Sequence, residues 1–182
     1  MRIIAGSAKR RNIVAPKGDT TRPTQDYIRE SLFNILQNYV YDANILDIFA
    51  GSGALGLEAI SRGARHCLFC DKNYRAIQAI QENITNLHFD EQSTLIKGDF
   101  TQALQYAEEH NLAFDIFFID PPYAFTGIDN LLNACIPLSA EDALFIVERD
   151  KSSPAPICNQ LEIYDTRNYG ITNIYLLQKK GV

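Results

Sequence analysis

The chain has 182 residues, of which 46% are apolar and 21% charged, and its formal net charge is −5. This length and composition fit one globular domain over residues 1–182 and exclude a disordered chain. No apolar run approaches the ~20 residues that span a bilayer, and the first residues turn polar and basic too early for a signal peptide. We therefore expect a soluble, cytoplasmic protein.

The positive charge is concentrated near the N-terminus. Residues 1–30 carry a net charge of +4, so the rest of the chain carries −9. Such asymmetry indicates binding partners better than the total charge does. The basic segment is either a nucleic-acid contact or a solvated tail. Its candidate phosphate-contacting residues are Arg10, Arg11, Arg22 and Arg29.

Residues 1–42 form an extension ahead of the main pattern. Two short β-like runs, 2–5 and 12–15, flank a cationic turn and predict a hairpin. After a loop punctuated by prolines, Thr24 is a candidate N-cap for an amphipathic helix. The apolar face of that helix comprises Ile28, Leu32, Ile35, Leu36, Tyr39 and Val40.

From residue 43 to residue 182, strand-like runs alternate with helical ones. The predicted strands are 44–49, 67–71, 93–97, 115–120, 143–148, 161–167 and 172–178. Helices are expected between the early strands, the first of them ending at Gly63, and later ones at 100–110 and 129–135. This alternation predicts a parallel, doubly wound α/β sheet. The last two strands have no room for a helix between them, so they should be antiparallel.

Cys67 and Cys70 have the C-x-x-C spacing of metal or redox pairs. They fall within a predicted strand, however, where residues three apart point to opposite faces. We expect buried packing residues and no metal site.

A glycine-rich loop follows the first strand. Gly51, Gly53 and Gly56 spell G-x-G-x-x-G, and Asp71 lies 20 residues after Gly51, at the end of the second strand. This pattern alone is weak evidence. It fits a nicotinamide cofactor and an adenosyl cofactor equally, because the acidic residue would bind ribose hydroxyls in either case.

Two further features favour S-adenosylmethionine. Asp47 lies inside the first strand, where its carboxylate can brace the loop and offset the positive sulfonium and ammonium groups. Asp99 and Phe100 follow the third strand, where they could contact an adenine ring. Asp99 could equally be a helix N-cap, and the two roles are compatible.

The segment Asp120-Pro121-Pro122-Tyr123 follows the fourth strand. A nucleobase amino nitrogen is a weak nucleophile because its lone pair is conjugated into the ring. Acceptors aimed at its N–H bonds, here the Asp120 carboxylate and the Pro121 carbonyl, would help it to become pyramidal. The two prolines restrict that carbonyl, and Tyr123 can stack on a flipped-out base for about 1–3 kcal/mol. Otherwise the segment would be a simple Pro-Pro turn.

These residues carry a family resemblance. The segment from Asp120 to Tyr123 resembles the D/N/S-P-P-Y/F/W motif of amino-directed methyltransferases, and 46–59 resembles their cofactor loop. The runs 2–6, 22–24 and 29–34 resemble those of the RsmD family, the bacterial 16S rRNA guanine-N2-methyltransferases. The resemblance spans residues 1–180 or so, in the family's order and spacing.

The resemblance implies a class I S-adenosylmethionine-dependent methyltransferase fold, Rossmann-like, with seven strands and the last one antiparallel. It also implies methylation of N2 of guanine 966 in 16S rRNA within the small ribosomal subunit. We expect the protein to be a monomer. Asp120, Pro121, Pro122 and Tyr123 would hold the base. The cofactor would be held by Asp47, Gly51, Ser52, Gly53, Asp71, Lys72, Asp99 and Phe100.

Other functions are open at this stage. The amino group could belong to adenine N6 in DNA or RNA, or to a protein glutamine. An NAD-dependent oxidoreductase would share the glycine loop, although none of the three histidines sits in a recognisable catalytic arrangement. An RNA-binding assembly factor could retain the same fold without turnover.

Overall fold

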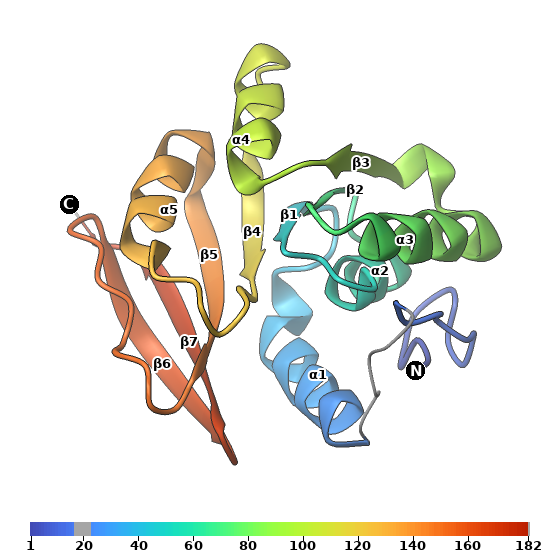
Figure 1. Cartoon of the computed structure of the whole chain (residues 1–182), viewed down its shortest axis with the longest axis horizontal. Coiled ribbons are helices and arrows are strands. Elements are labelled where there is room, and N and C mark those ends of the chain that lie inside the picture. Colours follow the sequence, from blue (N-terminus) through green and yellow to red (C-terminus); the bar gives the residue numbers. More distant parts are fainter. Residues whose placement is uncertain (17–22, 182) are drawn as a thin grey trace.

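A seven-stranded sheet forms the centre of the computed structural model, which describes residues 1–16 and 23–181 without the side chains of residues 23–25 (Figure 1). The strand order is β3-β2-β1-β4-β5-β7-β6. The strands are β1 (Asn44–Ile48), β2 (His66–Asp71), β3 (Ser93–Lys97), β4 (Phe114–Ile119), β5 (Ser139–Asp150), β6 (Leu161–Tyr169) and β7 (Thr172–Lys179). The first five pair in parallel, and β7 runs antiparallel to both β5 and β6. The predicted doubly wound sheet with an antiparallel last strand is confirmed.

Helices cover both faces of the sheet. They are α1 (Pro23–Ile35), α2 (Ala54–Ser61), α3 (Tyr74–Leu87), α4 (Phe100–Glu109) and α5 (Ile128–Cys135), with 3₁₀ turns η1 (Leu36–Asn38), η2 (Asp90–Gln92) and η3 (Ile136–Leu138). Alternate strand residues face opposite cores, as the two-residue period of a strand requires. Ile45 packs with α1, α2 and α3, whereas Leu46 and Ile48 pack with α4 and α5.

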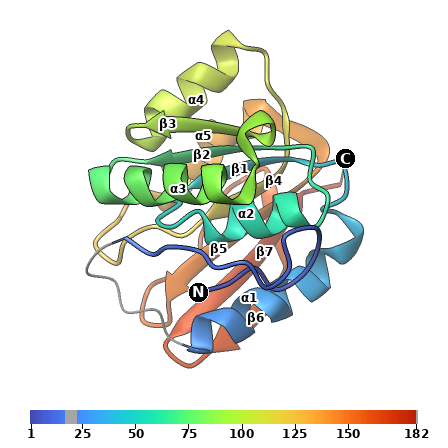
Figure 2. The ribbon, with the colours of Figure 1, turned by 90° about the vertical axis from the view of Figure 1, so that its right-hand side faces the viewer.

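The N-terminal segment lies against α2 and α3 (Figure 2). The predicted hairpin is reduced there to one antiparallel bridge, between Arg2 and Asn12. The amides of Ile4 and Ala5 donate to the Glu58 carboxylate on α2, at 2.8 and 3.0 Å, and not to a partner strand. Backbone hydrogen bonds from Ile3 to Arg11, from Arg10 to Ile3 and from Ile13 to Met1 still join the two runs, so the predicted hairpin is present without regular strands.

The first helix is shorter than its apolar pattern predicted. α1 ends at Ile35 and continues as η1, so Tyr39 is half exposed, while Leu32 and Leu36 are buried. α1 begins at Pro23, which puts Thr24 inside the helix and not at its N-cap; the side chain of Thr24 lies outside the described residues.

The predictions that Gly63 ends a helix and that Cys67 and Cys70 are packing residues are confirmed. Gly63, with φ of +101°, follows the end of α2. Cys67 and Cys70 are buried free thiols that pack into opposite cores. No group of metal-binding side chains is found among the described residues, and no helix in that part of the chain is long and apolar enough to cross a membrane.

The topology brings distant loops together. The strand order reverses between β1 and β4, where Ile48 pairs with Ile119. Ligands of open α/β sheets bind at such a switch point, beyond the carboxyl ends of the strands. The glycine loop after β1 and the proline segment after β4 therefore leave the sheet next to each other.

Candidate active site

The glycine loop turns sharply between β1 and α2. Phe49, Gly51 and Gly53 all have positive φ, of 64°, 58° and 75°. A phenylalanine in this region is strained, and such strain is concentrated at functional sites. A Cβ at Gly51 would meet only the Phe49 carbonyl oxygen, at 4.0 Å, so a ligand can approach the backbone there.

Gly56 has a different role. A Cβ at this position would lie 2.3 Å from the Phe69 ring and 2.5 Å from the Cys67 sulfur. The absence of a side chain therefore lets α2 pack directly on β2. Close packing of this kind is one function of glycine in nucleotide-binding loops.

Asp47 braces the loop, as its position in β1 suggested. Its buried carboxylate accepts the Gly56 amide at 3.0 Å. Burial raises the pKa of Asp47 to about 7, against the opposing effect of that hydrogen bond and with a further increase from the charge of Asp71. A cation bound nearby would favour the ionised form.

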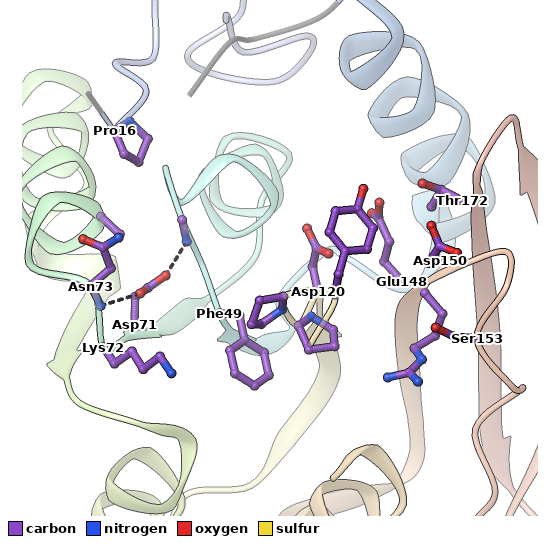
Figure 3. Close-up of a pocket in the computed structure, with 16 residues that line it drawn as sticks. Pro16, Phe49, Asp71, Lys72, Asn73, Asp120, Glu148, Asp150, Ser153 and Thr172 are labelled. Carbon is purple, nitrogen blue, oxygen red and sulfur yellow. Dashed lines mark hydrogen bonds between the residues drawn. The ribbon is translucent and has the colours of Figure 1, made fainter. Parts of the chain in front are cut away.

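Asp71, at the end of β2, holds the loop from the other side. Its two carboxylate oxygens accept the Gly51 amide at 2.9 Å and the Asn73 amide at 2.7 Å (Figure 3). Because both oxygens are engaged, the side chain is fixed beside the cleft. Lys72 lines the same cleft.

Asp99 and Phe100 follow β3 but do not line the cleft. Asp99 is exposed and forms a capping box with Gln102 at the start of α4, so the N-cap alternative is confirmed. Phe100 packs edge-on against Phe125, with ring centroids 6.0 Å apart, and also lies near Phe49. Phe49 lines the cleft, so these three rings form an aromatic cluster at its edge.

The proline segment forms the central part of the cleft wall. Asp120, Pro121, Pro122 and Tyr123 all line it together with Gly51. The Tyr123 side chain is 77% exposed and free to contact a flat ligand. The Pro122 carbonyl accepts the Phe125 amide at 2.8 Å, whereas the Pro121 carbonyl has no hydrogen-bond partner among the described residues.

Glu148, which the sequence reasoning did not single out, faces Asp120. Ile119 pairs with Val147, so the next residue of each strand is a carboxylate, and both line the cleft (Figure 3). Part of Asp120 is exposed to the open cleft. The protein around its carboxyl group removes much of the bulk water, and this desolvation raises the pKa of Asp120 well above the ordinary value; the negative charges of Glu148 and Asp47 add smaller increases. Burial also raises the pKa of Glu148, partly offset by a hydrogen bond from Thr172. The sequence signal that could have identified Glu148 is its position directly after the apolar run of β5.

The cleft has two connected lobes of about 420 and 790 Å³. Phe49, Gly51, Asp120, Tyr123 and Glu148 line both, so the lobes meet between the glycine loop and the proline segment. The larger lobe extends toward α1 and the turn between β6 and β7. Ser52 lines this lobe, whereas Gly53 lines neither.

The predicted basic contacts separate into different groups. Arg10 and Arg11 are exposed, although Arg11 also donates to the Asn86 carbonyl of α3. Arg22 lies outside the described residues. Arg29 is buried, and it pairs with Asp26 at 3.2 Å and Glu58 at 3.8 Å. Arg29 also lines the larger lobe of the cleft, with its charge already paired to acids from α1 and α2, and its contact with a phosphate stays a prediction.

The sheet order with an antiparallel β7, the glycine loop and the facing Asp-Pro-Pro-Tyr segment define the class I methyltransferase fold. The chain belongs to the family described as Conserved hypothetical protein 95, whose model matches residues 1–178. The resemblance to the RsmD methyltransferases is thereby confirmed.

Individual relatives agree with this assignment. Ribosomal RNA small subunit methyltransferase D of Haemophilus influenzae is 30% identical over 98% of this chain and 93% of its own length. YlbH of Bacillus subtilis, provisionally named an rRNA methyltransferase, is 35% identical over the whole of both chains. The solved structure of yhhF from Escherichia coli is 29% identical, covers 100% of this chain and 99% of that chain, and has a TM-score of 0.85.

Proposed function

We propose that this chain transfers a methyl group from S-adenosylmethionine to the N2 amino group of a guanine in 16S rRNA. The observation that carries the proposal is that Gly51 and Asp120 line one cleft at the β1–β4 switch point. The relative in Haemophilus influenzae that is named ribosomal RNA small subunit methyltransferase D supports 16S rRNA as the substrate.

The residues present fit the cofactor. Asp47 and residues 51–53 would hold its methionine part, Asp71 and Lys72 its ribose, and the aromatic cluster its adenine. Asp99, which caps α4, remains a candidate adenine contact on sequence grounds. The open space above Gly51 suits close approach to the backbone. Asp47, Asp120 and Glu148 form no ion pair within the described part of the chain, and their charge favours a cationic ligand. When bound, the cofactor supplies an electrophilic methyl group on its sulfonium.

The acceptor groups prepare the nucleophile. The Asp120 carboxylate and the unpartnered Pro121 carbonyl would accept the two N2–H bonds of the base and turn the nitrogen lone pair toward the methyl group. Fixed positioning of this kind supplies much of the rate gain when reacting atoms must be in line. The raised pKa of Asp120 suits it to take the proton that the nitrogen loses. Tyr123 would stack on the base.

The N-terminal extension would contact the RNA. In this proposal residues 1–42 extend a catalytic core of residues 43–182, and Arg10 and Arg11 contact phosphates. Arg22 remains a candidate contact on sequence grounds. The low overall positive charge suits a substrate presented by a ribonucleoprotein better than tight binding to naked RNA. We therefore propose that the substrate is the small ribosomal subunit. We also propose that the enzyme acts in the cytoplasm as a monomer.

The test uses small subunits from cells that lack this protein. Purified enzyme and methyl-labelled S-adenosylmethionine are added, and the 16S rRNA nucleosides are analysed by mass spectrometry, with naked 16S rRNA in parallel. We expect N2-methylguanosine at one position, and more of it on subunits. Labelled N6-methyladenosine, or binding without any incorporation, would contradict the proposal.

A further inference from the structure

Glu148 occupies the substrate side of the cleft. The candidate cofactor residues lie at the ends of β1, β2 and β3, whereas Glu148 ends the buried part of β5, beyond β4. Its nearest strand-end neighbour is Asp120, through the Ile119–Val147 pairing. In Figure 3 both side chains project from their strands into the same cleft.

The surroundings of Glu148 leave acceptor capacity unused. The side chain is half-buried, it receives a hydrogen bond from Thr172, and it forms no ion pair with any described residue. A carboxylate can accept about four hydrogen bonds. A second carboxylate at the neighbouring strand end makes this arrangement costly unless a ligand brings N–H groups to it.

The edge of guanine supplies such groups. In guanine the N2 amino group adjoins the ring N1–H, so two kinds of donor lie side by side. In adenine the N6 amino group adjoins N1, and in cytosine the N4 amino group adjoins N3; both ring nitrogens are acceptors. Enzymes that flip a base read this edge by hydrogen bonds.

We propose that the Glu148 carboxylate accepts the N1–H of the flipped guanine while Asp120 and Pro121 hold its N2, and that Glu148 thereby selects guanine. This inference rests on the proposed function and adds the residue that sets base specificity. An adenine or cytosine in the same pose would place a ring lone pair against the carboxylate, which is a repulsive contact. Specificity commonly depends on such a repulsive element as well as on the attractive one.

The test compares guanine with 2-aminopurine at the target position. 2-Aminopurine keeps the amino group at C2 but has an acceptor at N1 and lacks the oxygen at C6, so the effect of Glu148→Gln on the preference is what isolates N1. Small subunits are reconstituted from ligated 16S rRNA that carries either base, and kcat/KM for methyl transfer is measured. We expect the wild-type enzyme to favour guanine by about 100-fold or more.

Glu148→Gln should reduce this preference at least tenfold, because its amide offers an N–H donor to N1 of 2-aminopurine. Glu141→Gln is the matched control, since it is the same change at an exposed position of the same strand. It should keep the wild-type ratio. A purely structural role of Glu148 would lower both rates together and leave the ratio unchanged.

The outcomes distinguish a failure of the role proposed for Glu148 from a failure of the proposed methyltransferase function. An unchanged ratio in folded Glu148→Gln, or equal wild-type rates on the two bases, overturns the role of Glu148. Folding of the variant is judged by circular dichroism and by calorimetry with S-adenosylmethionine, and equal wild-type rates on the two bases overturn the role of Glu148 even if the variant does not fold. If the wild-type enzyme methylates no guanine at all, the proposed function itself fails.

Discussion

Ile48 and Ile119 pair at the ends of the parallel strands β1 and β4. The loop that follows each of them therefore enters the same cleft, and Gly51 lies across from Asp120. The proposed sites for the methyl donor and the methyl acceptor are brought together by this pairing, because each loop supplies only one of the two sites.

The packing role of Gly56 predicts a stability change. In Gly56→Ala the new Cβ would overlap the Phe69 ring and the Cys67 sulfur, so the backbone of α2 must shift. We expect a loss of about 1–3 kcal/mol in the free energy of unfolding, which is typical of overpacked cores. Urea denaturation measures it. Gly181→Ala, whose Cβ would meet nothing within 4 Å, is the control. Equal denaturation midpoints for wild type and Gly56→Ala would disprove the packing role.

Glu58 should hold the N-terminal segment in place. Its fully buried carboxylate accepts the Ile4 and Ala5 amides and pairs with Arg62 at 2.7 Å and with Arg29. Breaking a buried ion pair costs about 3–5 kcal/mol, because the partner charge is left uncompensated.

Glu58→Gln should therefore lower stability and speed hydrogen exchange at the Ile4 and Ala5 amides. Glu82→Gln, an exposed acid on α3, serves as the control and should leave exchange unchanged. Slow exchange retained in Glu58→Gln would mean that other contacts hold the segment.

The raised pKa of Asp47 predicts a pH dependence. An unfolded aspartate titrates near 3.8 and the folded one near 7, so the folded state binds the proton more tightly between these values. This carboxyl therefore destabilises the protein increasingly as the pH rises from about 4 to about 7, by on the order of 4 kcal/mol at most.

Asp47→Asn removes this titration and keeps an oxygen for the Gly56 amide. We expect the melting temperature of the variant, relative to wild type without ligand, to increase between pH 5 and pH 8. A constant difference across this range would show that Asp47 does not titrate there.

Arg10 tests the proposed RNA contact. Because its side chain is exposed, Arg10→Ala should weaken binding to small subunits and reduce the slope of log affinity against log salt by about 1. Lys180→Ala removes an exposed positive charge just after the end of β7 and should leave the slope unchanged. An unaltered slope in Arg10→Ala would remove Arg10 from the interface.

The strands and the principal acids could be predicted because both follow from local sequence. A buried strand reads as an apolar run, and Asp71 and Asp120 each end or closely follow one. The carboxyl ends of parallel strands share one edge of the sheet, so these acids had to converge.

The surroundings of Glu148 and Arg29 could not be predicted, because contacts between distant parts of the chain determine them. Glu148 became a site residue only because the register sets Val147 beside Ile119. Arg29 looked like a surface cation, but Glu58, from a helix later in the chain, neutralises it in the interior. The same carboxylate accepts the Ile4 and Ala5 amides of the N-terminal segment.

Asp120→Ala gives the most direct test of the central claim, that Asp120 acts on the amino nitrogen across the cleft from the glycine loop. The variant removes the side-chain acceptor and leaves the glycine loop unchanged. Methyl transfer to small subunits and affinity for S-adenosylmethionine by calorimetry are measured on the same preparation. We predict that the transfer rate falls by about 100-fold or more while the affinity changes less than about threefold. Undiminished transfer by Asp120→Ala would contradict the account.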